Sequence, residues 1–113
     1  MDRTAFLPPE IRALPAFEGP FDAFRLAAEG CDVLFATYPG GTAIEPHRHE
    51  TDNVGVITAG ELFLTVDGVE SRYGPGDWYH VAPGVEHGAR FEQDTAEIEL
   101  WFDARFTHDG SDD

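Results

Sequence analysis

Two histidines stand two residues apart in the stretch EPHRHETDN, residues 45–53, of a chain that contains only five histidines. On an extended segment the side chains of His47 and His49 leave the same face and can bind one ion together. A third histidine, His87, follows a turn rich in glycine and proline farther along the chain. Three imidazoles suit Zn, Fe, Ni or Cu, whereas Mg and Ca prefer oxygen ligands. These residues alone leave both a metal site and ordinary surface or hydrogen-bonded histidines open.

The composition limits the class of protein that could carry such a site. A chain of 113 residues with 42% apolar side chains, including two Trp, three Tyr and nine Phe, predicts one packed globular domain. Seven basic residues, all Arg, stand against 22 acidic ones, for a net charge of −15. Such a surface repels phosphate backbones and anionic lipid, so we expect no nucleic-acid partner and no membrane partner.

Compartment signals are few. The single Cys31 excludes an internal disulfide framework. No apolar run approaches the roughly 18 residues of a spanning helix. The start, MDRTAFLPPEIRALP, lacks a basic end followed by an apolar stretch. We therefore expect a cytoplasmic protein.

The elements that must position the histidines are predicted by turn residues and by alternation. Four prolines in residues 1–20 exclude a long helix there, although PEIRAL predicts one helical turn with Pro9 at its start. From Cys31 onward, runs of about six residues recur at roughly 8 to 12 residue spacing between Gly and Pro, which predicts antiparallel strands of a sandwich or barrel.

Two of these runs alternate with period two, which places each apolar trio on one face of a half-buried strand. The trios are Leu62, Leu64 and Val66 in the first run, and Ile98, Leu100 and Phe102 in the second. Asp67-Gly68, between two runs, is the strongest hairpin signal in the chain.

The full spacing around the histidines resembles a known family. Gly41, five residues, His47, one, His49, three, Asn53, six and Gly60 resemble the first cupin motif, G-x5-HxH-x3-E-x6-G. Gly76, seven residues, Gly84, two and His87 resemble the second motif, G-x5-PxG-x2-H-x3-N. The resemblance covers residues 41–91, and the strand pattern extends it to about 30–105.

The resemblance to a small single-domain cupin implies an all-β, double-stranded β-helix (jelly-roll) barrel whose metal sits inside one open end. We expect a Pro-rich N-terminal arm over residues 1–30, the cupin barrel domain over 31–105 and an acidic tail over 106–113. The implied ligands are His47, His49 and His87, and the expected cofactor is a divalent transition metal (Fe, Zn, Ni or Mn).

Three positions depart from the family pattern. Asn53 stands where the family has Glu, Ala82-Pro83-Gly84 replaces Pro-x-Gly, and Phe91 replaces the last Asn. Asn53 is a neutral ligand at best. The remaining three-histidine site resembles that of the three-histidine non-haem iron dioxygenases, but Asn53 is equally compatible with a barrel that no longer holds metal. A local shift of register would instead bring Glu50 or Asp52 to the ion.

Other candidates are single residues. His80 shares a strand face with Trp78 and is either a cavity acid or base or a packed or exposed strand histidine. Four aromatic residues either line a pocket or belong to the core or a dimer contact: Tyr38, Phe63, Tyr79 and Trp101. His108 lies in the tail. We find no phosphate-binding loop, nucleophile elbow or paired-carboxylate motif with supporting context.

Two functions follow from the resemblance. The first is a metal-dependent enzyme of dioxygenase, isomerase or lyase type that acts on a small organic molecule, and the second is a non-catalytic small-ligand-binding or sensor cupin. Sheet edges and apolar faces such as that of Val54 and Val56 need cover. We therefore expect a two-fold homodimer in which the arm or an outer strand crosses to the partner.

Overall fold

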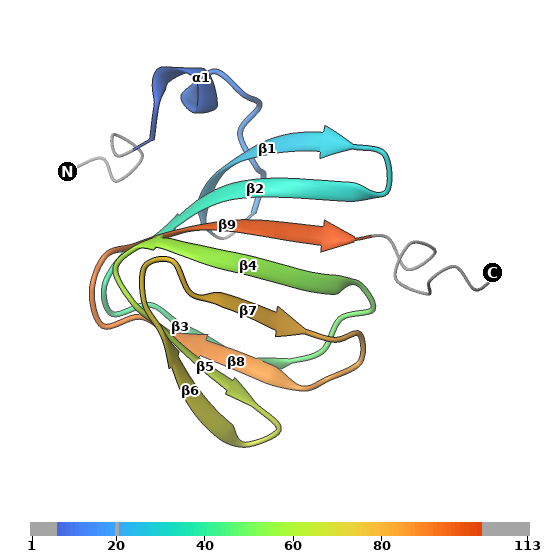
Figure 1. Cartoon of the computed structure of the whole chain (residues 1–113), viewed down its shortest axis with the longest axis vertical. Coiled ribbons are helices and arrows are strands. Elements are labelled where there is room, and N and C mark those ends of the chain that lie inside the picture. Colours follow the sequence, from blue (N-terminus) through green and yellow to red (C-terminus); the bar gives the residue numbers. More distant parts are fainter. Residues whose placement is uncertain (1–6, 20, 103–113) are drawn as a thin grey trace.

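The structure, a computed structural model, describes residues 7–19 and 21–102. Within these residues a short helix is followed by β-strands, which Figure 1 shows in chain order. The elements are α1 (Pro9–Arg12), β1 (Asp22–Ala28), β2 (Cys31–Tyr38), β3 (Ala43–His47), β4 (Asp52–Ala59), β5 (Leu62–Val66), β6 (Val69–Tyr73), β7 (Trp78–Val81), β8 (His87–Arg90) and β9 (Thr95–Phe102).

The strands form two antiparallel sheets. One sheet has the order β1-β2-β9-β4-β7 and the other has the order β3-β8-β5-β6. The last strand, β9, lies between β2 and β4, so the end of the barrel domain is built into the middle of the larger sheet (Figure 1). This arrangement confirms the predicted all-β jelly roll.

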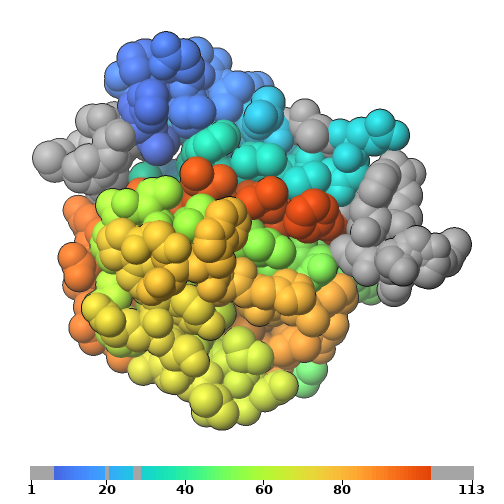
Figure 2. Space-filling view, viewed as in Figure 1, coloured from blue at the N-terminus to red at the C-terminus, as the bar shows by residue number. Residues whose placement is uncertain are grey.

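The N-terminal segment packs beside the edge of the larger sheet. The single turn of α1 begins with Pro9, as predicted. Ala16 then bridges to Phe24, and this segment lies against the β1 side of the molecule (Figure 2). Residues 22–28, which the prediction assigned to the arm, form β1 and pair with β2 along their whole length. The division into three regions stays a prediction, and the predicted tail, residues 106–113 with His108, lies outside the described residues.

Tight turns fix the registers that the site depends on. Val66 pairs directly with Val69, so Asp67-Gly68 forms the predicted two-residue hairpin turn, with positive φ at both residues. At Gly60, φ is +85°, and an added Cβ would overlap the backbone of Asp94 and Thr95. Only glycine is accommodated there without strain.

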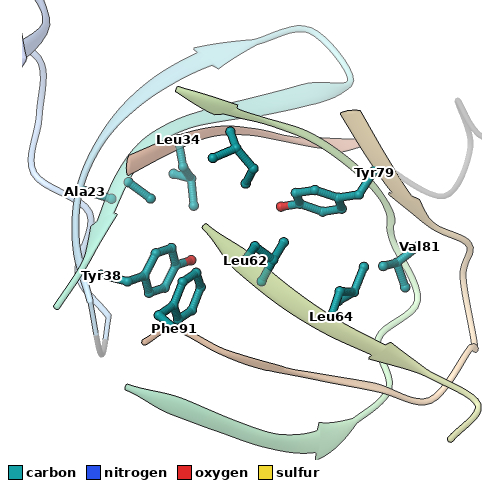
Figure 3. Packing of buried hydrophobic residues seen from close by; sticks show 10 residues of the cluster. Ala23, Leu34, Tyr38, Leu62, Leu64, Tyr79, Val81 and Phe91 are labelled. Atoms are coloured by element: carbon teal, nitrogen blue, oxygen red, sulfur yellow. The ribbon is translucent and has the colours of Figure 1, made fainter. Parts of the chain in front are cut away.

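The core lies between the two sheets. Leu62 and Leu64 are both buried, which confirms the predicted inner face of that strand. They pack in one cluster with side chains of both sheets (Figure 3), namely Ala23, Leu34, Ala36, Tyr38, Ile57, Tyr79, Val81 and Phe91.

Strand β9 differs from the other strands of the core. Its apolar residues Ile98, Leu100 and Phe102 do share one face, but that face is only half-buried. The alternate residues Glu97 and Glu99 are the buried ones, with 4% and 2% of their surface exposed. The inner face of β9 therefore carries carboxyl groups, and its apolar face points outward.

Candidate metal centre

The three histidines of the two motifs meet at one end of the smaller sheet. His47 is the last residue of β3 and pairs with His87, the first residue of β8, while His49 lies in the loop before β4. The ring centroids of His47 and His87 are 4.4 Å apart, and those of His49 and His87 are 4.6 Å apart. One ring nitrogen of each residue lies within 4.8 Å of the others, so the cluster could hold a metal ion.

Backbone carbonyls orient all three rings in the same way. The Nδ1 atoms of His47, His49 and His87 lie 2.9, 3.0 and 3.0 Å from backbone carbonyl oxygens two residues away. A carbonyl can only accept, so each Nδ1 carries the proton and donates it. Each Nε2 therefore keeps its lone pair, and this is the tautomer that a metal-binding histidine needs.

Burial favours the neutral form of two of the three histidines. It lowers the pKa of His49 and the pKa of His87 below the usual histidine range, and the nearby His47 acts in the same direction. The Nε2 atom of His49 is buried and has no hydrogen-bond partner among the described residues. A buried acceptor of this kind fits a metal ion, because it is otherwise left without its interaction with water.

Asn53 lies in the wall of the same cavity. It is 4% exposed, and its Nδ2 donates to the backbone carbonyl of Leu100 at 3.3 Å. This bond fixes the amide on β4 against β9, at the position where the family pattern has glutamate. A role for Asn53 as a fourth ligand stays a prediction.

The other predicted site residues point elsewhere. His80 is exposed and pairs with Asp52 across β4 and β7, on the outer face of the larger sheet. Its neighbours Tyr79 and Val81 face the core, because side chains alternate along a strand. His80 therefore lies outside the cavity, and a catalytic role for it stays a prediction. The same ion pair holds Asp52 outside, and Glu50 is exposed.

A cavity of about 370 Å³ opens between the sheets beside the histidines. Polar groups in its lining are His47, His87, Asn53, Thr42, Tyr38, Glu97 and Glu99, and apolar ones include Ile44, Leu62, Leu64, Val81, Phe91 and Trp101. Of the four predicted pocket aromatics, Tyr38 and Trp101 line it, Tyr79 belongs to the core, and Phe63 lies under the Arg90 guanidinium.

Glu97 and Glu99 are the polar residues that the sequence prediction missed. Tyr38 and Trp101 donate to Glu99, and Tyr79 donates to Glu97. The sequence offered no paired-carboxylate motif with supporting context, and the structure brings these two carboxyl groups together on the cavity wall. The sequence feature that could have predicted the pair is the alternation of β9, because Glu97 and Glu99 share one face of this strand whichever way that face points.

Trp101 connects the carboxyl pair with the histidines. Its Nε1 donates to Oε1 of Glu99 at 3.0 Å, and its ring lies edge-on to His49, with centroids 4.8 Å apart. Trp101 also lines a larger hollow of about 840 Å³, together with residues of the N-terminal segment and β1 such as Pro15, Phe17 and Arg25. None of the three histidines lines that hollow.

The motifs and the fold agree with one family, because residues 34–103 match the Cupin domain family. The chain belongs to the cupin family. It is similar to the H2HPP isomerase of Bacillus subtilis, with 36% identity over 70 residues, 61% of this chain and 30% of that protein. It is also similar to the HTH-type transcriptional regulator PuuR of Escherichia coli (strain K12), with 32% identity over 56 residues, 49% of this chain and 30% of that protein.

The chain thus matches less than a third of the length of either curated relative. Among solved structures, it is similar to an RmlC-like cupin from Shewanella frigidimarina NCIMB 400, with a TM-score of 0.70 and 26% identity, over 79% of this chain and 81% of that one. In the part of the chain that the structure describes, no helix has the length and apolar character needed to cross a bilayer.

Proposed function

We propose that this chain binds a divalent transition metal through the Nε2 atoms of His47, His49 and His87, and that it is an enzyme of isomerase type acting on a small organic molecule. The observation that carries the proposal is the common orientation of the three rings, each with its Nδ1 held by a backbone carbonyl. A bound divalent ion supplies Lewis-acid polarisation of a ligand oxygen.

The cavity wall supports a reaction rather than storage of the metal alone. Leu62, Leu64 and Phe91 give the interior apolar surface that excludes water. Glu97 and Glu99 add carboxyl groups on the same wall, and such groups transfer protons in many enzymes. The similarity to an isomerase favours proton transfer over oxygen chemistry.

The similarity to a transcriptional regulator favours a second candidate, a ligand-sensing cupin. With a net charge of −15, this chain would sense a small molecule without contacting nucleic acid itself. Turnover separates the two functions. An enzyme converts many equivalents of a small carbonyl compound per metal-loaded chain, which NMR follows directly, whereas a sensor binds one equivalent and returns it unchanged.

Metal binding is tested by calorimetric titration with zinc, ferrous iron and nickel. His87→Ala removes one of three imidazoles, and we expect a loss of affinity of about 100-fold or more. Asn53→Glu adds a negative charge near the ion, and we expect an increase of about tenfold. Occupancy should fall as the pH drops below about 6, because each imidazole must be neutral to bind.

His80→Gln is the matched control, because His80 lies on the outer face of the larger sheet. The metal affinity of this variant should equal that of the wild type. Equal affinities across all four proteins would contradict the metal site. The preferred metal follows from the same titrations and from elemental analysis of the purified protein.

We also infer that the outer face of the larger sheet is the contact between two copies of the chain. One unbroken row of apolar side chains crosses its five strands, each paired in register with the next: Phe24, Phe35, Ile98, Val56 and Trp78. Trp78 is 60% exposed. An apolar row of this length next to water favours a partner, and two such faces can pack on each other as sheets do in a sandwich.

A further inference from the structure

The carboxyl pair in the cavity is a second chemical site. Glu97 and Glu99 are almost completely buried on β9, and both line the cavity that His47 and His87 also line. The donors that other residues offer to these two carboxyl groups are uncharged, tyrosine hydroxyls and an indole N–H, and the two carboxyl groups also share a hydrogen bond with each other. Two adjacent buried carboxyl groups that share a hydrogen bond and have no cationic side chain as a partner strongly disfavour double ionisation, so the pair retains a proton.

The hydrogen bonds assign that proton to one residue. Glu99 is bonded at both oxygens, since Oε2 accepts from the Tyr38 hydroxyl and Oε1 accepts from Trp101. Glu97 accepts only at Oε2, from the Tyr79 hydroxyl at 3.0 Å. Its Oε1 is buried and has no partner among the described residues. Donated hydrogen bonds stabilise the ionised form, so Glu97, which receives fewer of them, is the residue that keeps the proton.

Electrostatics point in the same direction. Burial raises the pKa of Glu97 well above the usual carboxyl range, and the charge of Glu99 raises it further, whereas the hydrogen bond from Tyr79 lowers it. Titratable groups facing the pair or lining its cavity come from four strands: Tyr38 on β2, Tyr79 on β7, His47 on β3 and His87 on β8.

The surrounding sheet is built around this arrangement. Gly55 pairs with Tyr79 on one side and with Glu99 on the other. An added Cβ at Gly55 would overlap the Tyr79 ring, so the missing side chain is what lets the tyrosine cross β4 and reach β9. Tyr38 is held by stacking on Phe91, with ring centroids 4.3 Å apart. Both hydroxyl donors are therefore fixed by packing.

We propose that Glu97 is the catalytic proton-transfer residue of this cavity, acting on a small enolisable carbonyl compound, and that Glu99 and Tyr79 are its positioning residues. This rests on the proposed function, which brings the substrate to the histidines. The Glu97 carboxyl gives its proton to one end of a conjugated enol system. The resulting carboxylate then takes a proton from the other end. The product is an isomer of the substrate, the carboxyl group is restored, and no oxidant or second reactant is consumed.

Infrared difference spectroscopy tests the protonation state without relying on turnover. At neutral pH the metal-loaded wild type should show the C=O stretch of a protonated carboxyl, and Glu97→Gln should lack it. The titration midpoint of this band should move down in Glu99→Gln, which removes the neighbouring charge, and up in Tyr79→Phe, which removes the donor to the carboxylate. A band that is absent in the wild type, or that survives in Glu97→Gln, overturns the proposal.

Proton transfer is tested by uptake of deuterium from D₂O into 2-oxobutanoate at C3, followed by NMR with metal-loaded protein. Glu97→Gln should slow uptake by about 100-fold or more, the usual contribution of a general acid or base. Glu70→Gln, on the outer face of the smaller sheet, should leave it unchanged. Uptake that is absent in the wild type, or equally fast in Glu97→Gln, overturns the proposal.

The metal affinity of each variant is measured in parallel, so that the two proposals fail separately. A wild type that does not bind metal would overturn the proposed function. Normal metal binding without deuterium uptake would overturn only the role of Glu97. Thermal unfolding of Glu97→Gln verifies that the isosteric variant is folded. The opposite shifts of the titration midpoint of the infrared band in Glu99→Gln and Tyr79→Phe would not arise from a merely structural role.

Discussion

The two faces of the five-stranded sheet depart from a simple pattern of apolar residues inside and polar residues outside. Its inner face contributes Glu97, Glu99 and Asn53 to the barrel interior, while its outer face presents the row that runs from Phe24 to Trp78. Carboxyl groups are rarely buried without a charged partner, and apolar strand faces usually cover a core. This pattern supports the two proposed roles, binding and proton chemistry on the inner face and association on the outer face.

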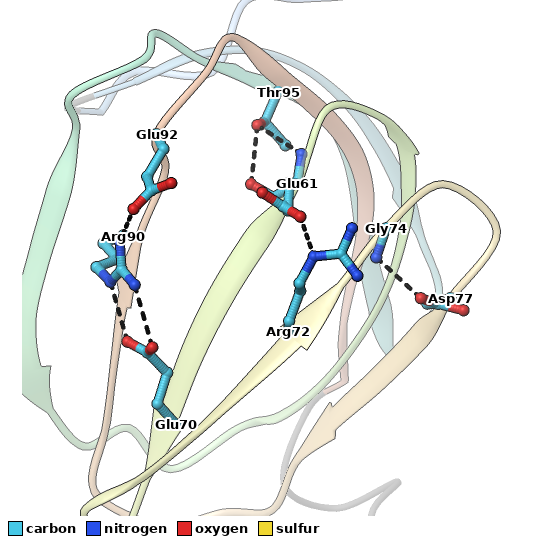
Figure 4. Close-up of polar contacts among 8 residues, drawn as sticks. All are labelled: Glu61, Glu70, Arg72, Gly74, Asp77, Arg90, Glu92 and Thr95. Carbon is cyan, nitrogen blue, oxygen red and sulfur yellow. Dashed lines mark hydrogen bonds and ion pairs between the residues drawn. The ribbon is translucent and has the colours of Figure 1, made fainter.

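The outer face of the smaller sheet provides the reference. There Arg90 makes a two-bond ion pair with Glu70, at 2.9 and 3.1 Å, and also contacts Glu92 (Figure 4). Arg72 pairs with Glu61 on the same sheet. The outer face of the smaller sheet is therefore charged and suited to water. The apolar outer face is a feature of the larger sheet alone and not of the whole barrel surface.

The largest expected effect concerns the outer face. Ile98→Lys places a charge in the middle of the apolar row, where burial between two sheets is strongly unfavourable. Light scattering at micromolar concentration should give the mass of a dimer for the wild type and of a monomer for this variant. Higher salt should strengthen the wild-type dimer, because it screens repulsion between two chains of charge −15.

Thr65→Lys is the control for that experiment. Thr65 lies on the smaller sheet opposite Glu70, which offers the new lysine a partner. This variant should remain dimeric. If the wild type is a monomer, or if the Ile98→Lys variant is still a dimer, the outer face of the larger sheet is not the contact between two copies of the chain.

The next effect concerns the inner face. Gly55→Ala forces its new methyl group against the Tyr79 ring, and overpacking of this kind costs about 1–3 kcal/mol of the free energy of unfolding. Urea denaturation measures it. If the tyrosine ring is the cause, adding Tyr79→Leu to Gly55→Ala should cost less than the two single changes predict together. If the two losses of unfolding free energy simply add, the cost of Gly55→Ala arises from the strand backbone and not from the Tyr79 ring.

A smaller effect is the pH dependence that Glu97 gives to stability. Its pKa is raised in the folded state, so above the usual carboxyl range the folded chain holds a proton that the unfolded chain has released. Stability from this group is complete at low pH and is lost as the pH rises toward the folded pKa, by up to about 1.4 kcal/mol per pH unit. Unfolding of the wild type and Glu97→Gln across pH 5 to 8 isolates this slope. Parallel curves would mean that Glu97 is ionised in the folded protein.

The smallest effect is expected at His80. Its pair with Asp52 lies at the surface, with 57% of the His80 side chain and 22% of the Asp52 side chain exposed, and surface pairs contribute about 0–1 kcal/mol. His80→Gln should therefore change the free energy of unfolding by less than about 0.5 kcal/mol, as measured by urea denaturation. A loss of several kcal/mol would mean that the outer face is more tightly coupled to the core than its exposure indicates.

Much of the site could be predicted from local signals. The spacing of His47 and His49, and the turn before His87, follow from neighbouring residues in the chain, and the structure brings these rings together. The hairpin at Asp67-Gly68 follows from turn chemistry in the same way. The backbone carbonyls that orient the rings could not be predicted, because they depend on the path of each loop.

The sequence by itself determined that β9 alternates, with Ile98, Leu100 and Phe102 on one face and Glu97 and Glu99 on the other. Only the tertiary structure decided which face is inside. Alternation defines two faces without assigning either to the core, and local hydrophobicity favours the wrong one here. The assignment follows from partners distant in the chain, because Tyr38 and Tyr79 supply hydrogen bonds that let two carboxyl groups lie within the barrel.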